Sequence, residues 1–438
     1  MVSELSFDDR SLAVAAQKQR FGAARVSIRF LALCSCAAVL WADGIPKAEY
    51  QSRRAELRKS LNGAMVLFGA EESSDLHYAF FQEPNFLYLS GWREPGAAMI
   101  ITPREEILFL PPRNLREETF TGRKTSAEDP DAVEKTGFDK VLPSAAIEAT
   151  FLRLTESAHR VYLDSSDARA QKLKTLAALH DLSAVAPEVA RLRVVKSAAE
   201  IGLIEKSVEA TVSAHLAAWK MVKPGLHEYE IAAAMTNVYF DLGCERSAYA
   251  PIVGSGANSV ILHYMANRAR VDRGEVVLMD VGAECSDYAA DVTRTVPASG
   301  QFTPRQREIY EIVLGAQKAA IAAVKPGARM NGPGGSLQQI ASRYIDSHGK
   351  DLHGDSLGKY FTHGLGHFVG LDVHDPGDLN KPLEAGMVIT IEPGVYIPEE
   401  KIGIRIEDTL LVTQDGARNL SGALPREPAD IEKLMGNR

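Results

Sequence analysis

Two aspartates in one short stretch, Asp280 and Asp291, have the spacing of carboxylates held on a hairpin. Asp280 ends the apolar run at 276–279, which predicts a buried strand. A reversal that contains Gly282 follows, and a second extended run at 288–296 carries Asp291. Two ionised carboxylates close together in an apolar setting repel each other, so this hairpin predicts a cation between them.

Two glutamates farther along the chain have the same unusual setting. Glu392 lies inside the hydrophobic run at 387–398, and Glu407 lies inside the run at 403–413. Both runs predict strands, and an acid buried in a strand needs a partner that offsets its lost hydration. Two such acids in succession, after two aspartates, again indicate a bound cation.

A histidine-rich segment supplies a nitrogen ligand. His363 and His367 are separated by Gly-Leu-Gly, a spacing that in a helix would place both imidazoles on one face. The glutamate of the zinc-helix motif is absent and two glycines disfavour a helix, so we predict a turn. Two further histidines lie in short segments that we expect to be extended: His263 at 260–265 and His374 at 371–375.

Four carboxylates and one imidazole form a candidate ligand set: Asp280, Asp291, His367, Glu392 and Glu407. Oxygen-rich ligation with one nitrogen suits manganese, cobalt or zinc. Four carboxylates exceed what one divalent ion needs, whereas two ions about 3.5–4 Å apart that share bridging carboxylates would neutralise them. Any one of these residues alone could be a salt-bridged acid or a hydrogen-bonded core histidine. All five together favour a two-metal site.

The surrounding sequence divides into two parts of different character. Over 46–192, strand-like runs alternate with charged helical segments, which predicts a self-contained α/β domain. Over 193–438, extended runs are surrounded by helices, which we expect at 197–221, 227–242, 304–324 and 336–348. Ser197 is the expected cap of the first of these helices. The predicted fold class is α/β (α+β), with the boundary close to residue 192.

The overall composition excludes some classes of partner. The chain has 438 residues, of which 45% are hydrophobic and 24% charged, and a formal net charge of -8. No basic stripe interrupts this acidic balance, so nucleic acid is not an expected partner. The four cysteines do not have zinc-finger spacing, and Cys34 and Cys36 are too close for an easy disulfide. A cysteine metal site is therefore not expected.

The N-terminal segment, residues 1–45, resembles a secretory signal peptide. Three arginines precede an apolar run at 30–42 that is too short to span a bilayer, so no integral membrane span is expected. We predict an exported protein, periplasmic or secreted. The stretch at 33–36 also resembles a lipoprotein signal, which would add a lipid anchor. The alternative is an extension that is no signal, which would leave the protein cytoplasmic.

Taken together, these motifs resemble the pita-bread dinuclear metallopeptidases, a family that includes methionine aminopeptidase, prolidase and Xaa-Pro aminopeptidase. The resemblance rests on five strings: His263, Asp280 with Asp291, H-G-L-G-H at 363–367, E-P-G at 392–394 and R-I-E-D at 405–408. The run at 81–91, with E-P-G at 94–96, resembles the N-terminal domain of aminopeptidase P. The resemblance implies a pita-bread catalytic domain with a mixed, mainly antiparallel sheet flanked by helices, preceded by a smaller α/β domain.

The resemblance also implies a role for each ligand. Asp291 and Glu407 would bridge two divalent ions. Asp280 would complete one metal site, and His367 with Glu392 would complete the other. Manganese is the metal expected from the family, with cobalt and zinc as alternatives.

Catalytic roles follow from the same resemblance. Glu392 would move protons to and from a hydroxide that the two metals activate. His263 and His374 would hold the substrate around the scissile bond, and His363 would help to shape that pocket. Arg405 would order the site from beside the ligand strand.

The implied activity is hydrolysis of the Xaa-Pro bond at the N-terminus of peptides that have proline at the second position. An Xaa-Pro dipeptidase is the nearest alternative. A creatinase-like hydrolase without metal and a non-catalytic binding module are further alternatives, which the complete ligand set disfavours. Since the family often forms dimers or tetramers, a homo-oligomer is expected.

The sequence departs from the aminopeptidase P pattern at three places. Phe120 stands where relatives commonly have a tryptophan that reaches a neighbouring subunit's pocket. The segment 376–381 lacks an arginine often found there, and the connection from Tyr396 to Arg405 is short, as in many prolidases. These departures leave the choice between aminopeptidase and dipeptidase open.

Overall fold

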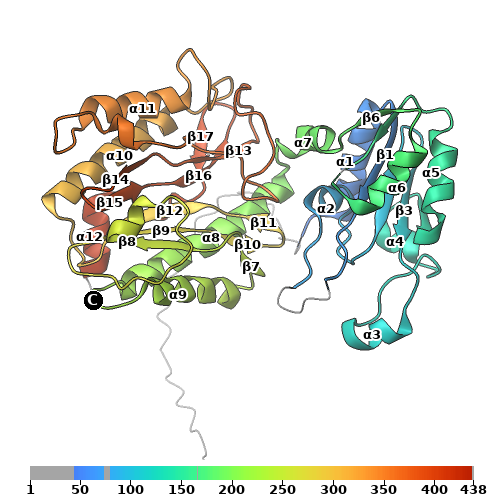
Figure 1. Cartoon of the computed structure of the whole chain (residues 1–438), viewed down its shortest axis with the longest axis horizontal. Coiled ribbons are helices and arrows are strands. Elements are labelled where there is room, and N and C mark those ends of the chain that lie inside the picture. Colours follow the sequence, from blue (N-terminus) through green and yellow to red (C-terminus); the bar gives the residue numbers. More distant parts are fainter. Residues whose placement is uncertain (1–43, 74–78, 165, 437–438) are drawn as a thin grey trace, which may run out of the picture. The chain divides into compact units, whose positions relative to one another are not determined.

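The computed structural model describes residues 44–73, 79–164 and 166–436 (Figure 1). Nearly all of the predicted signal segment, 1–45, lies outside these residues, so export stays a prediction. Among the described residues, no helix has both the length and the apolar composition that a membrane crossing requires.

The first part of the chain contains a six-stranded sheet in the order β4-β3-β2-β1-β5-β6. β2 pairs antiparallel with β1 and β3, whereas the outer pairs are parallel. The strands are β1 Gly63–Phe68, β2 Ala98–Ile101, β3 Glu106–Leu110, β4 Lys140–Pro143, β5 Arg160–Tyr162 and β6 Asp181–Ser183. The helices are α1 Lys47–Ser60, α2 Pro84–Ser90, α3 Leu115–Thr121, α4 Ala132–Thr136, α5 Ile147–Thr155, α6 Ala168–Leu176 and α7 Ala186–Arg193. Strand-like runs alternating with helices are therefore confirmed.

A capping box begins the long helix α8, Ala198–Met221, as the sequence predicts. The Ser197 hydroxyl accepts from the Glu200 N–H, while the Glu200 carboxylate accepts from the Ser197 N–H at 2.9 Å. This reciprocal pair satisfies two of the donors that a helix start leaves free. The break between α7 and α8 falls at 194–197, next to the predicted domain boundary.

In the second part of the chain, short sheets lie between two pairs of helices. Figure 1 shows α8 and α9 on one side of strands β8, β9 and β12, with α10 and α11 on the other side. The strands are β7 Arg246–Ser247, β8 Ile252–Ser255, β9 Val276–Val281, β10 Ala283–Cys285, β11 Tyr288–Ala289, β12 Val292–Pro297, β13 Val388–Ile391, β14 Gly394–Ile397, β15 Ile402–Arg405, β16 Asp408–Val412 and β17 Ala417–Asn419. The helices are α9 Glu228–Asp241, α10 Pro304–Ala322, α11 Leu337–His348 and α12 Pro428–Gly436. The four helices predicted for this part are confirmed.

The predicted aspartate hairpin is present, but three of the four acids lie at breaks between strands. Asp280 is inside β9, paired with Thr293 of β12. Asp291 lies just before β12, Glu392 lies between β13 and β14, and Glu407 lies between β15 and β16. The prediction that both glutamates lie inside strands is therefore wrong.

The breaks arise because the chain changes sheets at these points. β13 pairs with β16 in one sheet, whereas β14 pairs with β15 in another. Pro393, which has no N–H to donate, follows Glu392 at one crossing. At the other, the Glu407 N–H donates to the carbonyl of Thr293. Each crossing turns an acidic side chain toward the same space.

Two predicted extended segments are loops instead. His263 follows the short 3-10 helix at Gly256–Val260 and lies in irregular backbone. His374 lies in a bend, where the Asp375 carboxylate accepts from the Asp372 N–H at 3.2 Å and also binds Arg193. Local side-chain bonds of this kind compete with a sheet ladder. The extended prediction at 371–375 is wrong for this reason, and the one at 260–265 is wrong because the 3-10 helix ends there in a turn.

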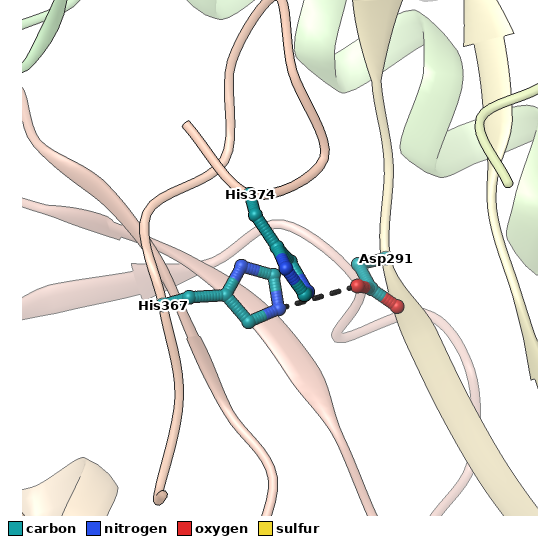
Figure 2. Close-up of side chains that lie close together, drawn as sticks. All are labelled: Asp291, His367 and His374. Atoms are coloured by element: carbon teal, nitrogen blue, oxygen red, sulfur yellow. Dashed lines mark ion pairs between the residues drawn. The ribbon is translucent and has the colours of Figure 1, made fainter. Parts of the chain in front are cut away.

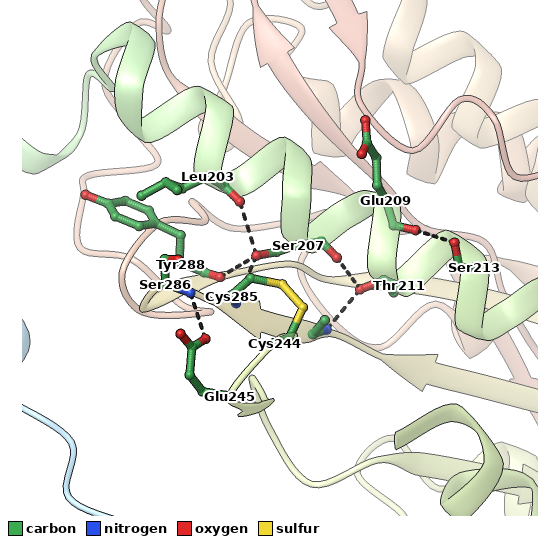
Figure 3. The surroundings of a disulfide bond; sticks show 11 residues. Leu203, Ser207, Glu209, Thr211, Ser213, Cys244, Glu245, Cys285, Ser286 and Tyr288 are labelled. Atoms are coloured by element: carbon green, nitrogen blue, oxygen red, sulfur yellow. Dashed lines mark hydrogen bonds between the residues drawn. A yellow bond between two sulfur atoms is a disulfide. The ribbon is translucent and has the colours of Figure 1, made fainter. Parts of the chain in front are cut away.

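A disulfide joins Cys244 to Cys285 beside the aspartate hairpin (Figure 3). The sequence analysis did not predict it, because the two cysteines are 41 residues apart and no spacing rule pairs them. From α8, the Ser207 hydroxyl donates to the Tyr288 carbonyl at 2.7 Å, and the Thr211 hydroxyl accepts from the Ala283 N–H at 2.9 Å. The turn between Asp280 and Asp291 is thus fixed by a covalent bond and by buried hydroxyls.

Candidate active site

The ligand set predicted from the sequence comes together in space. Potential ligand atoms lie within 4.8 Å of one another in each of three overlapping groups: Asp280, Asp291 and Glu407; His367, Glu392 and Glu407; and Asp291, His367 and His374. Figure 2 shows the last group, in which two imidazoles and one carboxylate from separate segments converge. All five predicted ligands therefore belong to a single cluster.

Burial and mutual repulsion raise the pKa values of three of these acids well above their usual range. For Asp291 the causes are burial, then the charges of Asp280 and Glu392. Burial and the charge of Glu407 do the same to Glu392. Burial and the charge of Asp291 do the same to Glu407. The protein alone therefore disfavours ionisation of a site in which every acid has another acid nearby.

Tyr249 lies between two of these carboxylates. Its hydroxyl oxygen lies 2.5 Å from an Oδ1 atom of both Asp280 and Asp291. A hydroxyl has one proton, so it donates to only one of these two oxygens. No motif marks Tyr249 in the sequence, so it was not among the predicted site residues. The fold alone brings it to the cluster.

The donor set fits divalent cations. The Oε1 atom of Glu407 is buried and has no hydrogen-bond partner within the described part of the chain, which is the state of a ligand atom rather than of a structural acid. Its Oε2 atom accepts from the Thr293 hydroxyl at 2.6 Å. Among the described residues that line the cavity, Arg405 is the one permanent cation. Four carboxylates and one arginine leave an excess of negative charge that two divalent ions would balance.

The orientation of His367 suits a metal ligand. Its Nδ1 donates to the carbonyl of Phe368 at 3.0 Å, which leaves the other ring nitrogen, Nε2, as the acceptor. That Nε2 lies 3.3 Å from Asp291 and 3.5 Å from Glu392. The free nitrogen therefore faces the carboxylates.

Arg405 connects the acid cluster to His363. One end of its guanidinium pairs with the Asp280 carboxylate, and Nη1 donates to the Tyr396 hydroxyl at 2.7 Å. The Tyr396 hydroxyl in turn donates to Nε2 of His363 at 2.8 Å, while Nδ1 donates to the Gly364 carbonyl. Burial, then the charge of Arg405, lowers the pKa of His363 to about 4. His363 is therefore a neutral imidazole near pH 7. Tyr396 is a second residue that the sequence analysis did not find.

The cluster forms the floor of a cavity of about 410 Å³. His263 and His374 both line it, and the His374 ring lies 4.1 Å from the His367 ring between centroids. Apolar side chains complete the walls: Ile252, Leu262, Met265 and Val373. A small peptide with an apolar ring fits the chemistry of this lining.

Two family models match this chain. Residues 202–414 match metallopeptidase family M24, and residues 50–162 match the aminopeptidase P N-terminal domain. The Xaa-Pro aminopeptidase of Haemophilus influenzae is 35% identical over 428 residues, which cover 89% of this chain and 98% of that relative. The chain belongs to metallopeptidase family M24.

Solved structures of aminopeptidase P proteins have a similar fold. Proline aminopeptidase P II from Yersinia pestis has a TM-score of 0.80 at 31% identity and covers 90% of this chain and 100% of that chain. Zinc-substituted Escherichia coli aminopeptidase P in complex with product also has a TM-score of 0.80, at 31% identity, and covers 90% and 99%. The predicted family and the two-domain pita-bread fold are confirmed. The exact domain boundary and the roles of single residues stay predictions.

Proposed function

We propose that this protein removes the first residue from peptides that have proline at the second position, by metal-dependent hydrolysis of the Xaa-Pro bond. One observation carries the proposal: four carboxylates and the free nitrogen of His367 converge on the floor of an apolar-walled cavity. Relatives that match nearly the full chain are Xaa-Pro aminopeptidases.

The cluster would hold two divalent ions. We assign Asp291 and Glu407 as shared ligands, Asp280 to one ion, and His367 with Glu392 to the other. When bound, the ions would make water more acidic and polarise the scissile carbonyl. We propose manganese as the metal, with cobalt and zinc as the alternatives; one related structure, from Escherichia coli, is zinc-substituted.

The protein's own groups then handle the proton and the substrate. Glu392 lines the cavity beside the other ligands, and burial and the charge of Glu407 raise its pKa above its usual range, which suits a group that accepts and returns a proton. His263 and His374 line the cavity and are placed to contact the peptide around the scissile bond. His363, held neutral by burial and Arg405, shapes the wall without adding charge.

The chemistry of proline explains why such a wall is needed. The nitrogen of an Xaa-Pro bond has no N–H, so the site must select the ring by shape and apolar contact. After attack, the leaving nitrogen needs a proton, which Glu392 is positioned to return. The cavity therefore combines an apolar surface for the ring with a proton donor at its floor.

A peptide panel tests the proposal. Chelator-treated protein should regain hydrolysis of a longer Xaa-Pro peptide when manganese, cobalt or zinc is added, while the same peptide with alanine in place of proline should be cleaved far more slowly. Strong preference for the dipeptide Gly-Pro would indicate an Xaa-Pro dipeptidase. Activity that resists complete metal removal would favour the creatinase-like alternative, and no hydrolysis with any metal would favour a binding module.

The variant Glu392→Gln tests the assigned proton carrier. The amide keeps the size of the side chain but cannot accept a proton, so kcat should fall by at least about 10³-fold. Near-normal turnover by this variant with both metals bound would contradict the role.

We also propose that the protein is exported and forms a homo-oligomer. The Cys244–Cys285 disulfide supports export, since disulfides persist mainly in oxidising compartments. Phe120, on α3, is 80% exposed, so its ring is accessible for contact with a second subunit. A mass measurement of the N-terminus in the exported fraction, together with light scattering of the purified protein, would test both. An intact residue 1–40 segment, or a monomer, would contradict the respective proposal.

A further inference from the structure

The loop that carries His263 has no support from a strand. After the 3-10 helix Gly256–Val260, the backbone is irregular until residue 269. Within the described part of the chain, no hydrogen bond or ion pair holds the His263 imidazole, and its side chain is exposed. The position of this imidazole therefore depends on whatever orders the loop.

One buried carboxylate joins the two ends of this loop. Glu228, the first residue of α9, has an exposed fraction of 0%. Its Oε1 atom accepts from the Ser255 N–H at 2.7 Å, from the Ser255 hydroxyl at 2.9 Å and from the Asn258 amide at 3.0 Å. Its Oε2 atom accepts from the Ala269 N–H at 2.8 Å. The first partners lie before His263 in the sequence and the last lies after it.

The backbone of Glu228 strengthens the same connection. Its N–H donates to the Ala269 carbonyl at 3.0 Å, so Ala269 is held by both the main chain and the side chain of Glu228. The side chain makes no ion pair within the described residues, and the donors to its two oxygens are neutral groups of β8, of the 3-10 helix and of the late end of the loop. A buried carboxylate that accepts only from neutral donors does not neutralise a cation, so its role is to hold the two ends of the loop in place.

The early end of the loop is itself fixed to the catalytic sheets. The Gly403 N–H, inside strand β15, donates to the Ser259 hydroxyl at 2.8 Å. Asn267, near the late end, accepts from the Val253 N–H at 2.9 Å. Glu228 thus connects the segment before the loop, which is bonded to β15, with the end of the loop at Ala269, which pairs with the start of α9. Closing the loop in this way reduces the conformations open to His263.

We propose that Glu228 is a positioning residue that holds His263 at the mouth of the substrate cavity. This inference rests on the proposed function, because it assigns His263 to the substrate. The carboxylate does not touch the substrate cavity itself; it acts through Ser255, Asn258 and Ala269 on the segment between them. A displacement of about 1 Å in a catalytic group can cost about a hundredfold in rate.

The variant Glu228→Gln tests the inference with little change in volume. An amide offers one acceptor oxygen, so its NH₂ group must face either the Ala269 N–H or the donors of Ser255 and Asn258. We expect kcat/KM for an Xaa-Pro peptide to fall by about tenfold to a hundredfold, mainly through kcat, with metal content unchanged. Glu230→Gln is the matched control, because Glu230 lies on the same helix, is partly exposed and does not contact this loop; its kcat/KM should stay within about twofold of the wild type.

A double-mutant cycle separates positioning from general destabilisation. In a His263→Ala background, Glu228→Gln should change kcat/KM by less than about threefold, because the group that it positions is absent. Asn258→Ala, which removes one donor to the same carboxylate, should give a smaller loss that also vanishes in that background; it keeps the test valid if Glu228→Gln does not fold. Equal losses with and without His263 would overturn the inference.

Hydrogen exchange gives a readout that does not need activity. In Glu228→Gln, the amides of Ser255 and Ala269, which donate to Glu228, should exchange at least about tenfold faster while those of β9 and β12 stay protected. Unchanged exchange at Ser255 and Ala269 would overturn the inference even if activity falls. Absence of wild-type turnover on every Xaa-Pro peptide would refute the proposed function instead, and the exchange result would still decide whether Glu228 orders the loop.

Discussion

Two adjacent acids, Glu407 and Asp408, are both fully buried and yet have opposite surroundings. Glu407 faces the acid cluster, where burial and Asp291 raise its pKa. Asp408 faces the other side, where Arg294 and Arg426 outweigh the effect of burial and lower its pKa. Its carboxylate lies 2.6 Å from Arg294 and 3.0 Å from Arg426.

The difference shows what this fold does when it buries a carboxylate for structure. Arg294 is fully buried, and its Nη1 donates to the carbonyls of Thr293 and Glu407 at 3.0 and 2.6 Å. Two arginines of the chain, Arg294 and Arg426, thus neutralise the structural acid Asp408. Among the described residues that line the cavity, the acids on the Glu407 side have one permanent cation, Arg405, which is paired with Asp280. Bound divalent ions would supply the positive charge that these acids lack.

Removing the Glu407 charge should have the largest effect on activity. Glu407→Gln keeps the shape but removes the carboxylate that we propose as a ligand shared by two ions, so kcat/KM should fall by more than about 10³-fold and metal content should drop. Because the substitution also relieves repulsion, the metal-free variant should be at least as stable as the metal-free wild type. Thermal unfolding after chelation measures this, and a clearly less stable variant would contradict the comparison.

The neighbouring substitution should have the opposite profile. Asp408→Asn leaves the buried Arg294 without its charged partner, so the free energy of unfolding should fall by about 3–5 kcal/mol. If it folds, the Asp408→Asn variant should bind the same number of metal ions as the wild type. Denaturant unfolding and metal analysis check the two halves of this prediction, and loss of metal without loss of stability would reverse the assignment of the two faces.

The disulfide should contribute to stability without taking part in charge balance. A double Cys244→Ser, Cys285→Ser variant should lose about 2–4 kcal/mol, because the bond closes a long loop in the unfolded chain. Its metal stoichiometry should not change. Reduced wild-type protein is the matched control and should unfold at the same denaturant concentration as the double variant.

The smallest expected effect is a pH dependence of metal stabilisation. In the metal-free protein, the raised pKa values of Asp291, Glu392 and Glu407 mean that the folded state holds protons that the unfolded chain releases above about pH 4. Their contribution to stability is therefore lost as the pH rises. Metal binding needs the ionised forms, so the increase in Tm on adding metal should be larger at pH 7.5 than at pH 5. An equal increase at both pH values would argue against a carboxylate site.

The sequence predicts which residues come together as metal ligands better than it predicts the backbone around them. Acids in hydrophobic runs and the glycine-separated histidines are visible as residue types, so five of the six residues whose ligand atoms come together could be named in advance as ligands, all but His374. The sheet crossings at Glu392 and Glu407 could not, because a hydrophobic run has the same appearance whether it forms one strand or two. The roles of Tyr249, Tyr396 and Glu228 depend on contacts between distant segments, and the Cys244–Cys285 pair depends on the fold as well.

Metal stoichiometry tests the central claim most directly. Purified wild-type protein, treated with chelator and then reconstituted with manganese, should contain two ions per chain by elemental mass spectrometry, and the Glu407→Gln variant should contain fewer. A wild-type chain that binds no ion, or a Glu407→Gln variant that binds as many as the wild type, would contradict the conclusion that these acids are held together by metal.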